Sequence, residues 1–238
     1  MNVGDGITKL GVALNGTTIE ELVDQAERAY SSSCDFVEWR ADYFKDCNDI
    51  KNFVKACKTL RDAMNDKPII FAYRTSREGG SGADISIAEY LLIYKTAILS
   101  KSVDAVDVEF LQGDTAVNTI VKHAEISDCK VIISNHDADS TPGKDILINR
   151  IKTMKERGAD IVKIGMEPRS GQDVDTMIEV CKEMSKEMPI IMISTNKMGV
   201  ITRIDAEKIG SALTYGYLDE PTGKGQLPIE ELAEMVKK

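Results

Sequence analysis

The sequence predicts an α/β protein that folds as a single (β/α)8 TIM barrel over residues 1–238. Short apolar segments alternate with longer amphipathic stretches along the whole chain. The segments are apolar on both faces for most of their length, as expected for parallel strands covered by helices. No linker or low-complexity run divides the chain, and its length suits one barrel. In chain order, the expected strands are Leu10–Leu14, Cys34–Arg40, Ile69–Arg74, Val103–Glu109, Val131–His136, Asp160–Gly165, Ile190–Ser194 and Ser211–Tyr215.

Helical signals fill the intervals between these strands. Residues Thr17–Leu22 place a glutamate three residues after a threonine, which is the pattern of a capped helix start. Ser86–Leu99 and Asp175–Lys186 carry apolar residues at three- and four-residue steps. The alternative fold is a doubly wound open sheet, which has a glycine-rich G-x-G-x-x-G turn after its first strand. Asn15–Thr18 does not supply that turn, and the number of strands favours the barrel.

Composition excludes several classes of protein. The chain has 39 acidic and 30 basic residues and a net charge of −9, which argues against nucleic acid or an anionic membrane surface as its main partner. No stretch approaches the ~20 apolar residues of a membrane helix, and the N-terminus does not resemble a signal peptide. The five cysteines include no C-x-x-C pair, so we expect reduced thiols and a cytoplasmic location.

Charged and polar residues recur where the expected strands end. Residues two apart on a strand share a face, and in a barrel the carboxyl ends of the strands build the active site. A charge in a buried strand is costly unless it is paired, so this repetition predicts a functional pocket. The residues that share a face in this way are Glu38 with Arg40, Asp107 with Glu109, and Ser134 with His136, and Arg74 ends its own strand.

Lys163 is the sharpest single signal. It lies between Val162 and Ile164, and apolar surroundings favour the neutral amine, which can form a Schiff base with a ketone. The alternative is a structural lysine that reaches solvent or pairs with Asp107 or Glu109.

His136 is a candidate proton carrier near neutral pH, and its alternative is a hydrogen-bonded structural histidine. His123 resembles an exposed helix residue. The two histidines and scattered cysteines form no metal-binding motif, so we expect no metal bound by protein ligands, although carboxylates at the barrel mouth leave Mg²⁺ open.

Two glycine-rich loops are expected over the same mouth. Arg77–Gly82 and Thr222–Gln226 each follow a strand, and glycines there permit a mobile lid or close approach of backbone to a ligand. Neither loop has the order of a phosphate-binding P-loop. Taken separately, each is better explained as an ordinary flexible loop.

Together these residues resemble the type I 3-dehydroquinate dehydratase family. The order and spacing of the pieces, more than any one of them, carry the resemblance, which covers nearly the whole chain. The matching pieces are Glu38–Asp42, Arg74–Thr75 with Glu78–Gly80, Ser134–Asp137 with Thr141–Pro142, Val162–Ile164, Met198–Gly199 leading to Thr202–Arg203, Gly210–Ser211 with Leu213–Tyr215, and Gly225–Gln226.

The resemblance implies the dehydration of 3-dehydroquinate to 3-dehydroshikimate in the shikimate pathway of aromatic amino acid biosynthesis. It implies that Lys163 is the Schiff-base lysine, that His136 is the general acid–base and that Glu78 assists the histidine. It further implies that Arg203 holds the substrate carboxylate and that no redox or metal cofactor is needed. Homodimers are common in the family. Substrate-pocket positions carried over in the same way are Glu38, Arg40, Arg74, Thr222 and Gln226.

The chain departs from the family pattern at a few positions, and other functions are open from the residues alone. Thr222 and Thr202 stand where the family usually has serine, Asn135 replaces an aromatic residue, and Ile193 and Thr195 replace part of a methionine-rich strand end. The nearest alternative is a class I aldolase, which would share the lysine but is commonly expected to have a phosphate site near the last two strands. An inert barrel that binds a small carboxylic acid is a more distant one.

Overall fold

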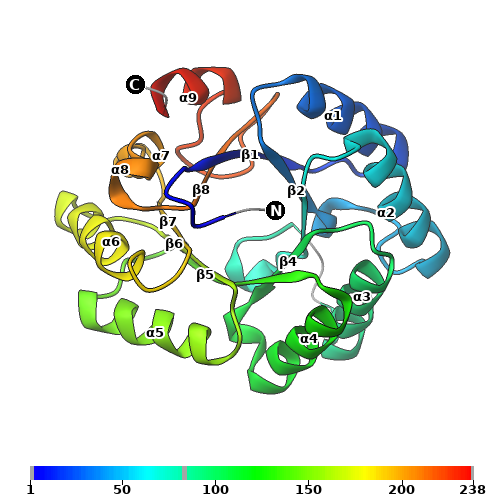
Figure 1. Ribbon diagram of the computed structural model, residues 1–238, viewed down its shortest axis with the longest axis horizontal. Coiled ribbons are helices and arrows are strands. Elements are labelled where there is room, and N and C mark those ends of the chain that lie inside the picture. Colours follow the sequence, from blue (N-terminus) through cyan, green and yellow to red (C-terminus); the bar gives the residue numbers. More distant parts are fainter. Residues whose placement is uncertain (1–2, 82–84, 237–238) are drawn as a thin grey trace.

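The computed structural model describes residues 3–81 and 85–236, which build a ring of helices around a central sheet (Figure 1). Eight parallel strands pair in the order β7-β6-β5-β4-β3-β2-β1-β8, and β7 and β8 meet through one bridge between Ile190 and Ser211. The sheet is therefore a nearly closed barrel, and the predicted fold class is confirmed. The strands are β1 (Lys9–Leu14), β2 (Phe36–Arg40), β3 (Ile69–Ala72), β4 (Ala105–Glu109), β5 (Lys130–Asp137), β6 (Ile161–Met166), β7 (Ile190–Ser194) and β8 (Leu213–Gly216).

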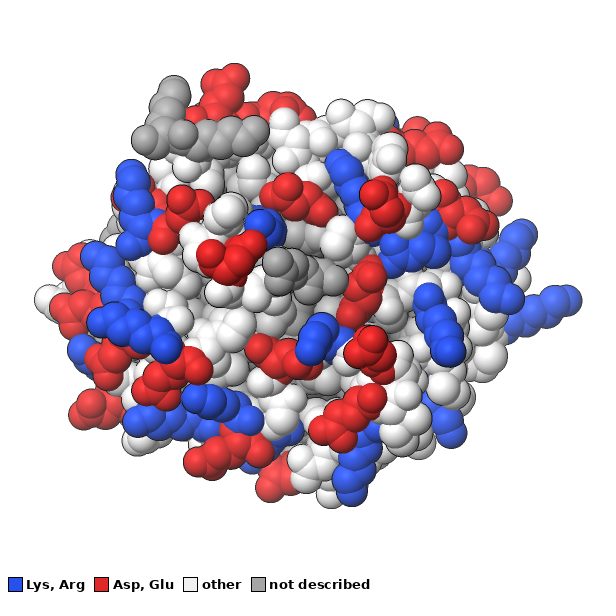
Figure 2. Space-filling view, in the orientation of Figure 1, with Lys and Arg blue, Asp and Glu red and all other residues white. Residues whose placement is uncertain are grey.

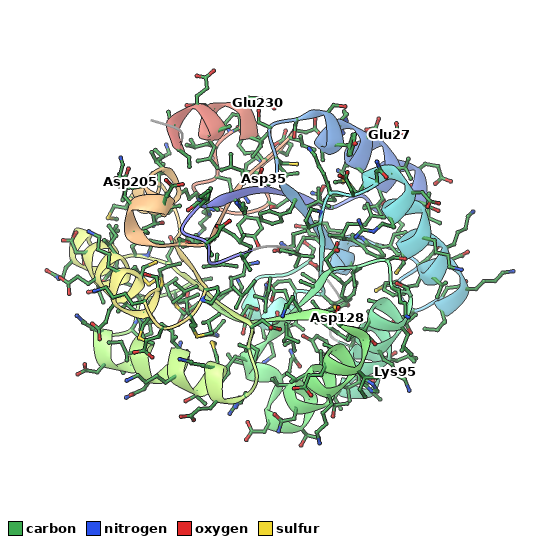
Figure 3. The ribbon with its side chains drawn as sticks, in the orientation of Figure 1. Glu27, Asp35, Lys95, Asp128, Asp205 and Glu230 are labelled. Atoms are coloured by element: carbon green, nitrogen blue, oxygen red, sulfur yellow. The ribbon has the colours of Figure 1, made fainter. Side chains whose placement is uncertain are left out.

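The helices follow the strands in alternation and turn their polar faces outward, as Glu27 and Lys95 show at the rim of the molecule (Figure 3). The α-helices are α1 (Ile19–Ser31), α2 (Ile50–Met64), α3 (Ile87–Leu99), α4 (Asp114–Ser127), α5 (Lys144–Glu156), α6 (Gly171–Met184), α7 (Ile201–Ile204), α8 (Ala206–Ile209) and α9 (Ile229–Val236). Short 3-10 turns are η1 (Ala41–Tyr43), η2 (Ser76–Glu78) and η3 (Phe110–Gln112).

Side-chain caps set the helix starts. The Thr18 hydroxyl accepts the backbone N–H of Glu21, as the TTIEEL pattern predicts. Ser86 and Glu89 form a reciprocal capping box at the start of α3. The expected helix Asp175–Lys186 begins earlier, at Gly171, because Ser170 and Asp173 form a second capping box.

Aspartates at the amino ends of alternate strands explain why three strands start later than predicted. Asp35, Asp104 and Asp160 precede β2, β4 and β6, and each carboxylate accepts a backbone N–H from the first residues of the preceding strand. The backbone N–H of each aspartate also donates to a carbonyl of that neighbouring strand, so side chain and backbone of the aspartate together close the end of the ladder. Figure 2 shows basic and acidic side chains interspersed on the face in view, without a continuous basic surface there.

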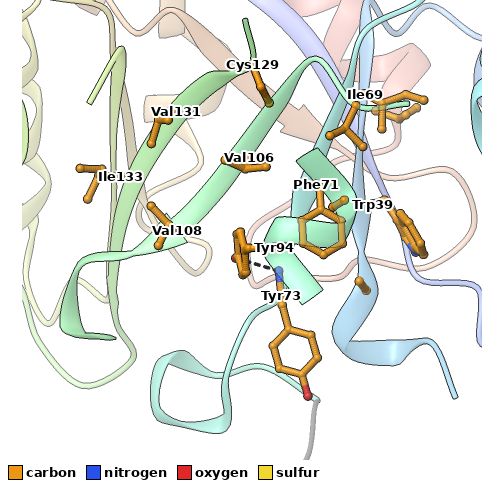
Figure 4. Packing of buried hydrophobic residues seen from close by; sticks show 14 of the residues in the cluster. Trp39, Ile69, Phe71, Tyr73, Tyr94, Val106, Val108, Cys129, Val131 and Ile133 are labelled. Atoms are coloured by element: carbon orange, nitrogen blue, oxygen red, sulfur yellow. Dashed lines mark hydrogen bonds between the residues drawn. The ribbon is translucent and has the colours of Figure 1, made fainter. Parts of the chain in front are cut away.

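The barrel has two apolar layers. Outward-facing strand residues pack under the helices, where Trp39, Phe71 and Tyr94 bring their rings together and Val106 and Val131 continue the layer (Figure 4). Inward-facing residues form a separate cluster inside the barrel, which includes Phe36, Ile70, Ala105, Ile132, Ile161, Ile191, Leu213 and Tyr215. The inner cluster closes the barrel interior, so a pocket can open only beyond its last layer.

Strand β3 ends at Ala72, two residues before the predicted end. The backbone N–H of Tyr73 donates to the Tyr94 hydroxyl at 3.2 Å, which Figure 4 marks, and that of Arg74 donates to the Asp42 carboxylate at 3.2 Å. Side chains therefore replace the strand ladder here. Arg74 leaves the sheet and turns across the barrel mouth.

Candidate active site

A cavity of about 360 Å³ opens at the carboxyl ends of the strands. Alternation along each strand aims one set of side chains inward, and the charged members of that set lie beyond the inner apolar cluster. The structure brings together in this cavity every residue for which the sequence predicts a site role. These residues are Glu38, Arg40, Arg74, Glu78, His136, Lys163, Arg203, Thr222 and Gln226.

Lys163 projects from β6 and is 4% exposed. Its Nζ atom donates to Glu38 Oε2 at 2.7 Å and to Asp107 Oδ2 at 2.8 Å. The expected apolar environment of the amine is therefore wrong, because Val162 and Ile164 point to the outer face of the strand. Of the two carboxylates proposed as structural partners, Asp107 is bound and Glu109 is not. Both bound carboxylates accept hydrogen bonds from the amine and so fix its position.

Arg74 balances the remaining acids beside the lysine. Its guanidinium contacts Glu78 Oε2 at 3.4 Å, Asp107 Oδ2 at 3.2 Å and Glu109 Oε1 at 3.3 Å. Burial opposes the charge of Arg74, but these acids raise its pKa well above the usual value. Burial likewise opposes the charge of Asp107, yet Lys163 and Arg74 lower the pKa of this carboxyl. The pocket floor is thus a compensated network of opposite charges.

His136 ends β5 and is held by Glu78. Glu78 Oε2 accepts the backbone N–H of His136 at 2.8 Å and lies 2.9 Å from Nδ1 of the ring. Burial, followed by the charges of Arg74 and Lys163, lowers the pKa of His136 well below its usual value. Burial raises the pKa of Glu78. A Cβ at Gly165 would lie 2.7 Å from His136 Cδ2, so this glycine makes room for the ring.

Arg203 in α7 is a buried cation of a different kind. Its Nη1 and Nη2 atoms donate to the backbone carbonyls of Tyr215 at 3.4 Å and Lys224 at 3.2 Å. Within residues 3–81 and 85–236, no carboxylate forms an ion pair with it, and its Nε has no hydrogen-bond partner. Burial lowers the pKa of Arg203 to about 10. An anion at this position would compensate the charge and accept a hydrogen bond from the free donor.

The glycine-rich loop after β8 lies over the cavity in an ordered form. The Gln226 side-chain carbonyl accepts the backbone N–H groups of Thr222 at 2.7 Å and Gly223 at 3.0 Å. Lys224 Nζ lies 3.4 Å from Glu167 Oε1. Gly225 has φ +75°, and a Cβ there would lie 2.3 Å from a neighbouring carbonyl oxygen, so the turn requires glycine. This is the loop expected over the mouth.

The loop after β3 contributes Glu78 and Gly79 to the cavity lining. Gly80 allows the close approach of the loop, because a Cβ there would lie 1.9 Å from the carbonyl oxygen of Arg74. The last residue of the predicted Arg77–Gly82 loop, Gly82, lies outside the described residues. Among the described residues of this loop, the glycine at position 80 is therefore explained by its close packing against Arg74.

Several residues of the site escaped the sequence prediction. Asp42 holds Arg40 by two hydrogen bonds of 2.8 Å and also accepts the backbone N–H of Arg74. Asp107 was predicted as a strand-end acid and as a possible ion-pair partner of Lys163, but not as a site residue. Tyr215 and Thr195 line the cavity from β8 and from the end of β7. Strand parity offered a signal for Asp107 and Tyr215, whereas Asp42 lies in the turn η1 and was marked only by the family resemblance of Glu38–Asp42.

The other histidine, His123, lies away from the cavity and on α4 as expected, but it is half-buried and not exposed. Among the described residues, no group of three or more histidine, cysteine, aspartate or glutamate side chains could hold a metal ion. No helix in the described part of the chain is long and apolar enough to cross a membrane.

A model of the type I 3-dehydroquinase family matches residues 10–238. The chain belongs to this family. The 3-dehydroquinate dehydratase of Bacillus subtilis is 34% identical over 239 residues, which cover 99% of this chain and 93% of that protein. The corresponding protein of Clostridium kluyveri is 37% identical over 241 residues, covering 100% of this chain and 94% of that one.

Solved structures of the family agree with this assignment. The type I 3-dehydroquinate dehydratase of Clostridium difficile, determined with covalently modified comenic acid, has a TM-score of 0.96 at 34% identity and covers 100% of this chain and 94% of that one. The Geobacillus kaustophilus enzyme has a TM-score of 0.95 at 26% identity, with 100% and 95% covered. The predicted family, fold and activity, a type I 3-dehydroquinate dehydratase and carbon–oxygen lyase, are therefore confirmed.

Proposed function

We propose that the pocket dehydrates 3-dehydroquinate to 3-dehydroshikimate through a covalent imine on Lys163, with His136 as the proton carrier. One observation carries the proposal: a buried lysine amine and a histidine of lowered pKa line the same cavity. A lysine amine condenses with a ketone, and a neutral histidine accepts a proton near neutral pH. Binding a small acid without reaction would need neither group.

Arg203 supplies the anchor for the substrate carboxylate. Its buried charge lacks a carboxylate partner within the described residues, and its planar fork matches a carboxylate in two hydrogen bonds. Thr222 and Gln226 lie in the loop over the same part of the cavity and close around the bound acid. The substrate anion then compensates the charge that the protein leaves unpaired.

Lys163 is the second group that holds the substrate, because it reacts with the substrate ketone. The ammonium loses a proton before its nitrogen attacks the ketone carbon, and the resulting carbinolamine takes up a proton and loses its hydroxyl as water to give the iminium. Overall, one ammonium and one ketone give one iminium and one water, so the nitrogen is positively charged before and after the step. Glu38 and Asp107 hold this nitrogen before the substrate arrives. The iminium withdraws electrons from the neighbouring carbon, whose proton is otherwise weakly acidic, and stabilises the resulting enamine.

His136 carries the proton in two steps. It removes the proton from the carbon beside the iminium and then protonates the departing hydroxyl, so that water leaves. Glu78 orients the ring through the 2.9 Å contact to Nδ1, which leaves Nε2 as the working atom. We assign Arg40 and Arg74 to the part of the cavity wall that receives the ring hydroxyls of the substrate, and Glu38 to the part of the substrate pocket beside Lys163, because all three line the cavity.

We also propose that the protein is a cytoplasmic homodimer. Helix α3 exposes Leu92 (48%) and Leu99 (56%), which lie two turns apart on one face, and the adjacent α4 exposes Ile126 (84%). Burial of these side chains against a second copy favours association. Replacing Leu92 and Leu99 by aspartate should convert a dimeric mass in sedimentation to a monomeric one. The five cysteines, all free and buried, support a reducing compartment.

A direct assay tests the reaction. Incubation with 3-dehydroquinate should produce the absorbance of a conjugated enone, and Lys163→Met should abolish it. Release of smaller carbonyl fragments without an enone would identify an aldolase instead. Tight binding of 3-dehydroquinate by the unmodified protein without turnover would identify a binding protein.

A further inference from the structure

Tyr215 has no role in the reaction described so far, yet it forms part of the cavity wall. It lies on β8 with its ring turned into the barrel and is 4% exposed. The Phe36 ring meets it edge-on, with centroids 5.4 Å apart and an angle of 87°. A Cβ at the facing Gly11 would lie 2.2 Å from the Phe36 ring, so this glycine makes room for the pair. The tyrosine is thus held in one orientation.

The ring of Tyr215 faces the reactive nitrogen. Lys163 Nζ lies 4.7 Å from the ring centroid, a distance at which the electron-rich face of the ring attracts a cation. The attraction depends on the charge of the nitrogen and persists when an ammonium becomes an iminium. The ring therefore favours both cationic forms of the lysine.

The hydroxyl of Tyr215 is an unused donor in the free protein. It is buried and lies near the Glu38 carboxylate, but no group in the described part of the chain forms a hydrogen bond of normal geometry with it. Burial and the nearby charge of Glu38 raise the pKa of Tyr215 well above its usual value, so the phenol keeps its proton. A buried donor without an acceptor is costly, which points to a state of the enzyme in which an acceptor is present.

Formation of the imine frees a carboxylate that can accept this hydrogen bond. The Lys163 ammonium has three N–H groups and donates to Glu38 and to Asp107. When it condenses with a ketone, two of these hydrogens leave with the ketone oxygen as water, and the nitrogen keeps its charge and one N–H. A single N–H serves one carboxylate, so the other loses its donor.

Glu38 is the carboxylate that loses its donor. Asp107 is fully buried beneath the cavity, does not line it, and keeps hydrogen bonds from Arg74 Nη2 at 3.2 Å and from the Ser134 hydroxyl. Glu38, in contrast, lines the cavity together with Lys163. Within the described residues, Lys163 is the one hydrogen-bond donor to Glu38.

We propose that the Tyr215 hydroxyl replaces Lys163 as the hydrogen-bond donor to Glu38 in the covalent intermediate, while its ring stays over the iminium. This inference rests on the proposed imine at Lys163. Tyr215 is then a positioning residue, which keeps the Glu38 carboxylate beside the cationic nitrogen after the lysine has changed its bonding.

Tyr215→Phe keeps the ring and removes the hydroxyl alone. With saturating 3-dehydroquinate and borohydride, we expect the fraction of protein trapped as a Lys163 adduct and kcat to fall roughly tenfold, as for loss of a hydrogen bond to a charged group. The thermal midpoint of the free protein should not fall, because the hydroxyl makes no hydrogen bond of normal geometry there and its burial is costly. Tyr215→Leu, which also removes the ring, should lose more, and Tyr30→Phe on the outer face of α1 should change neither quantity.

The outcomes separate this inference from the proposed function. Wild-type levels of trapped adduct and kcat in Tyr215→Phe would overturn the role of the hydroxyl while leaving the imine intact. A lowered thermal midpoint in Tyr215→Phe with an unchanged trapped fraction would assign the hydroxyl to stability and overturn it as well. Absence of any Lys163 adduct in the wild-type protein would overturn the proposed function first and this inference with it.

Discussion

The pocket holds two buried cations whose surroundings differ in charge. Lys163 contacts the carboxylates of Glu38 and Asp107, and Arg74 beside it balances further acids. Arg203, equally buried, donates to two backbone carbonyls and has no ion pair in the described part of the chain. One region is therefore compensated before the substrate binds, and the other is not.

The difference separates two contributions of the protein, the positioning of the reactive nitrogen and the affinity for the substrate carboxylate. Two ion pairs fix the lysine nitrogen, so its position is set before the reaction starts. The arginine bears the cost of a buried, unpaired charge, and a substrate carboxylate removes that cost on binding. The protein thus fixes the position of the reactive nitrogen at Lys163, and it provides affinity for a substrate carboxylate at Arg203.

Removal of Lys163, the cation with carboxylate partners, should have the largest effect on activity and stability. We expect Lys163→Met to lower kcat by about 10⁴-fold or more, because the nucleophile is lost. It should also lower the free energy of unfolding by ~3–5 kcal/mol, since Glu38 and Asp107 keep buried charges without a partner. Enone assays and denaturant melts measure the two effects. Lys163→Arg is the matched control, which should retain more stability but no activity.

His136→Ala tests the proton carrier next to this network. Loss of general acid–base help should lower kcat by ~10²–10⁴-fold. The Lys163 adduct should still form, because imine formation precedes the step assigned to the histidine. Borohydride trapping followed by intact mass measures this retention. Full turnover in the variant would remove His136 from the mechanism.

Arg203→Met sharpens the comparison by removing the uncompensated cation. We expect kcat/KM to fall by roughly 10–100-fold, as for loss of charge-assisted hydrogen bonds to the carboxylate. The thermal midpoint of the free protein should not fall, in contrast to Lys163→Met, because a buried unpaired charge is removed. Arg203→Lys keeps a charge without the fork and should recover little activity. Equal destabilisation by both methionine variants would contradict the comparison.

The smallest expected effect concerns pH. The folded protein lowers the pKa of His136 below the ~6.5 of an unfolded chain, so its contribution to stability is present above pH ~6.5 and is lost as pH falls towards the folded pKa. The unfolded chain binds the proton first, and stability should decrease by at most ~1.4 kcal/mol per pH unit in that range. Denaturant melts between pH 5 and 8, compared with His136→Ala, measure this slope. An identical slope in the variant would rule out His136 as its source.

Strand periodicity predicted the direction of the site residues. The inward set on β6, Ile161, Lys163 and Gly165, follows from alternation alone, and so does the pairing of Ser134 with His136 on one face. The same alternation explains the main error. Val162 and Ile164 adjoin Lys163 in sequence but lie on the opposite face of the strand, so they say little about its surroundings.

Contacts between segments that are distant in the chain could not be predicted from the sequence. Glu38 and Lys163 are 125 positions apart, and the 2.7 Å bond between them depends on the register of all the strands between β2 and β6. The missing partner of Arg203 is equally a property of the assembled pocket. Strand starts were misplaced where Asp35, Asp104 and Asp160 bond to neighbouring strands, because periodicity does not show where a polar side chain bonds.

The central claim is that Lys163 forms a covalent imine with the substrate ketone. Borohydride added to the protein with 3-dehydroquinate, followed by peptide mapping, measures this claim most directly. We predict a reduced substrate adduct on the peptide that contains Lys163 and on no other peptide. Active protein with an unmodified Lys163 after this treatment would contradict the account.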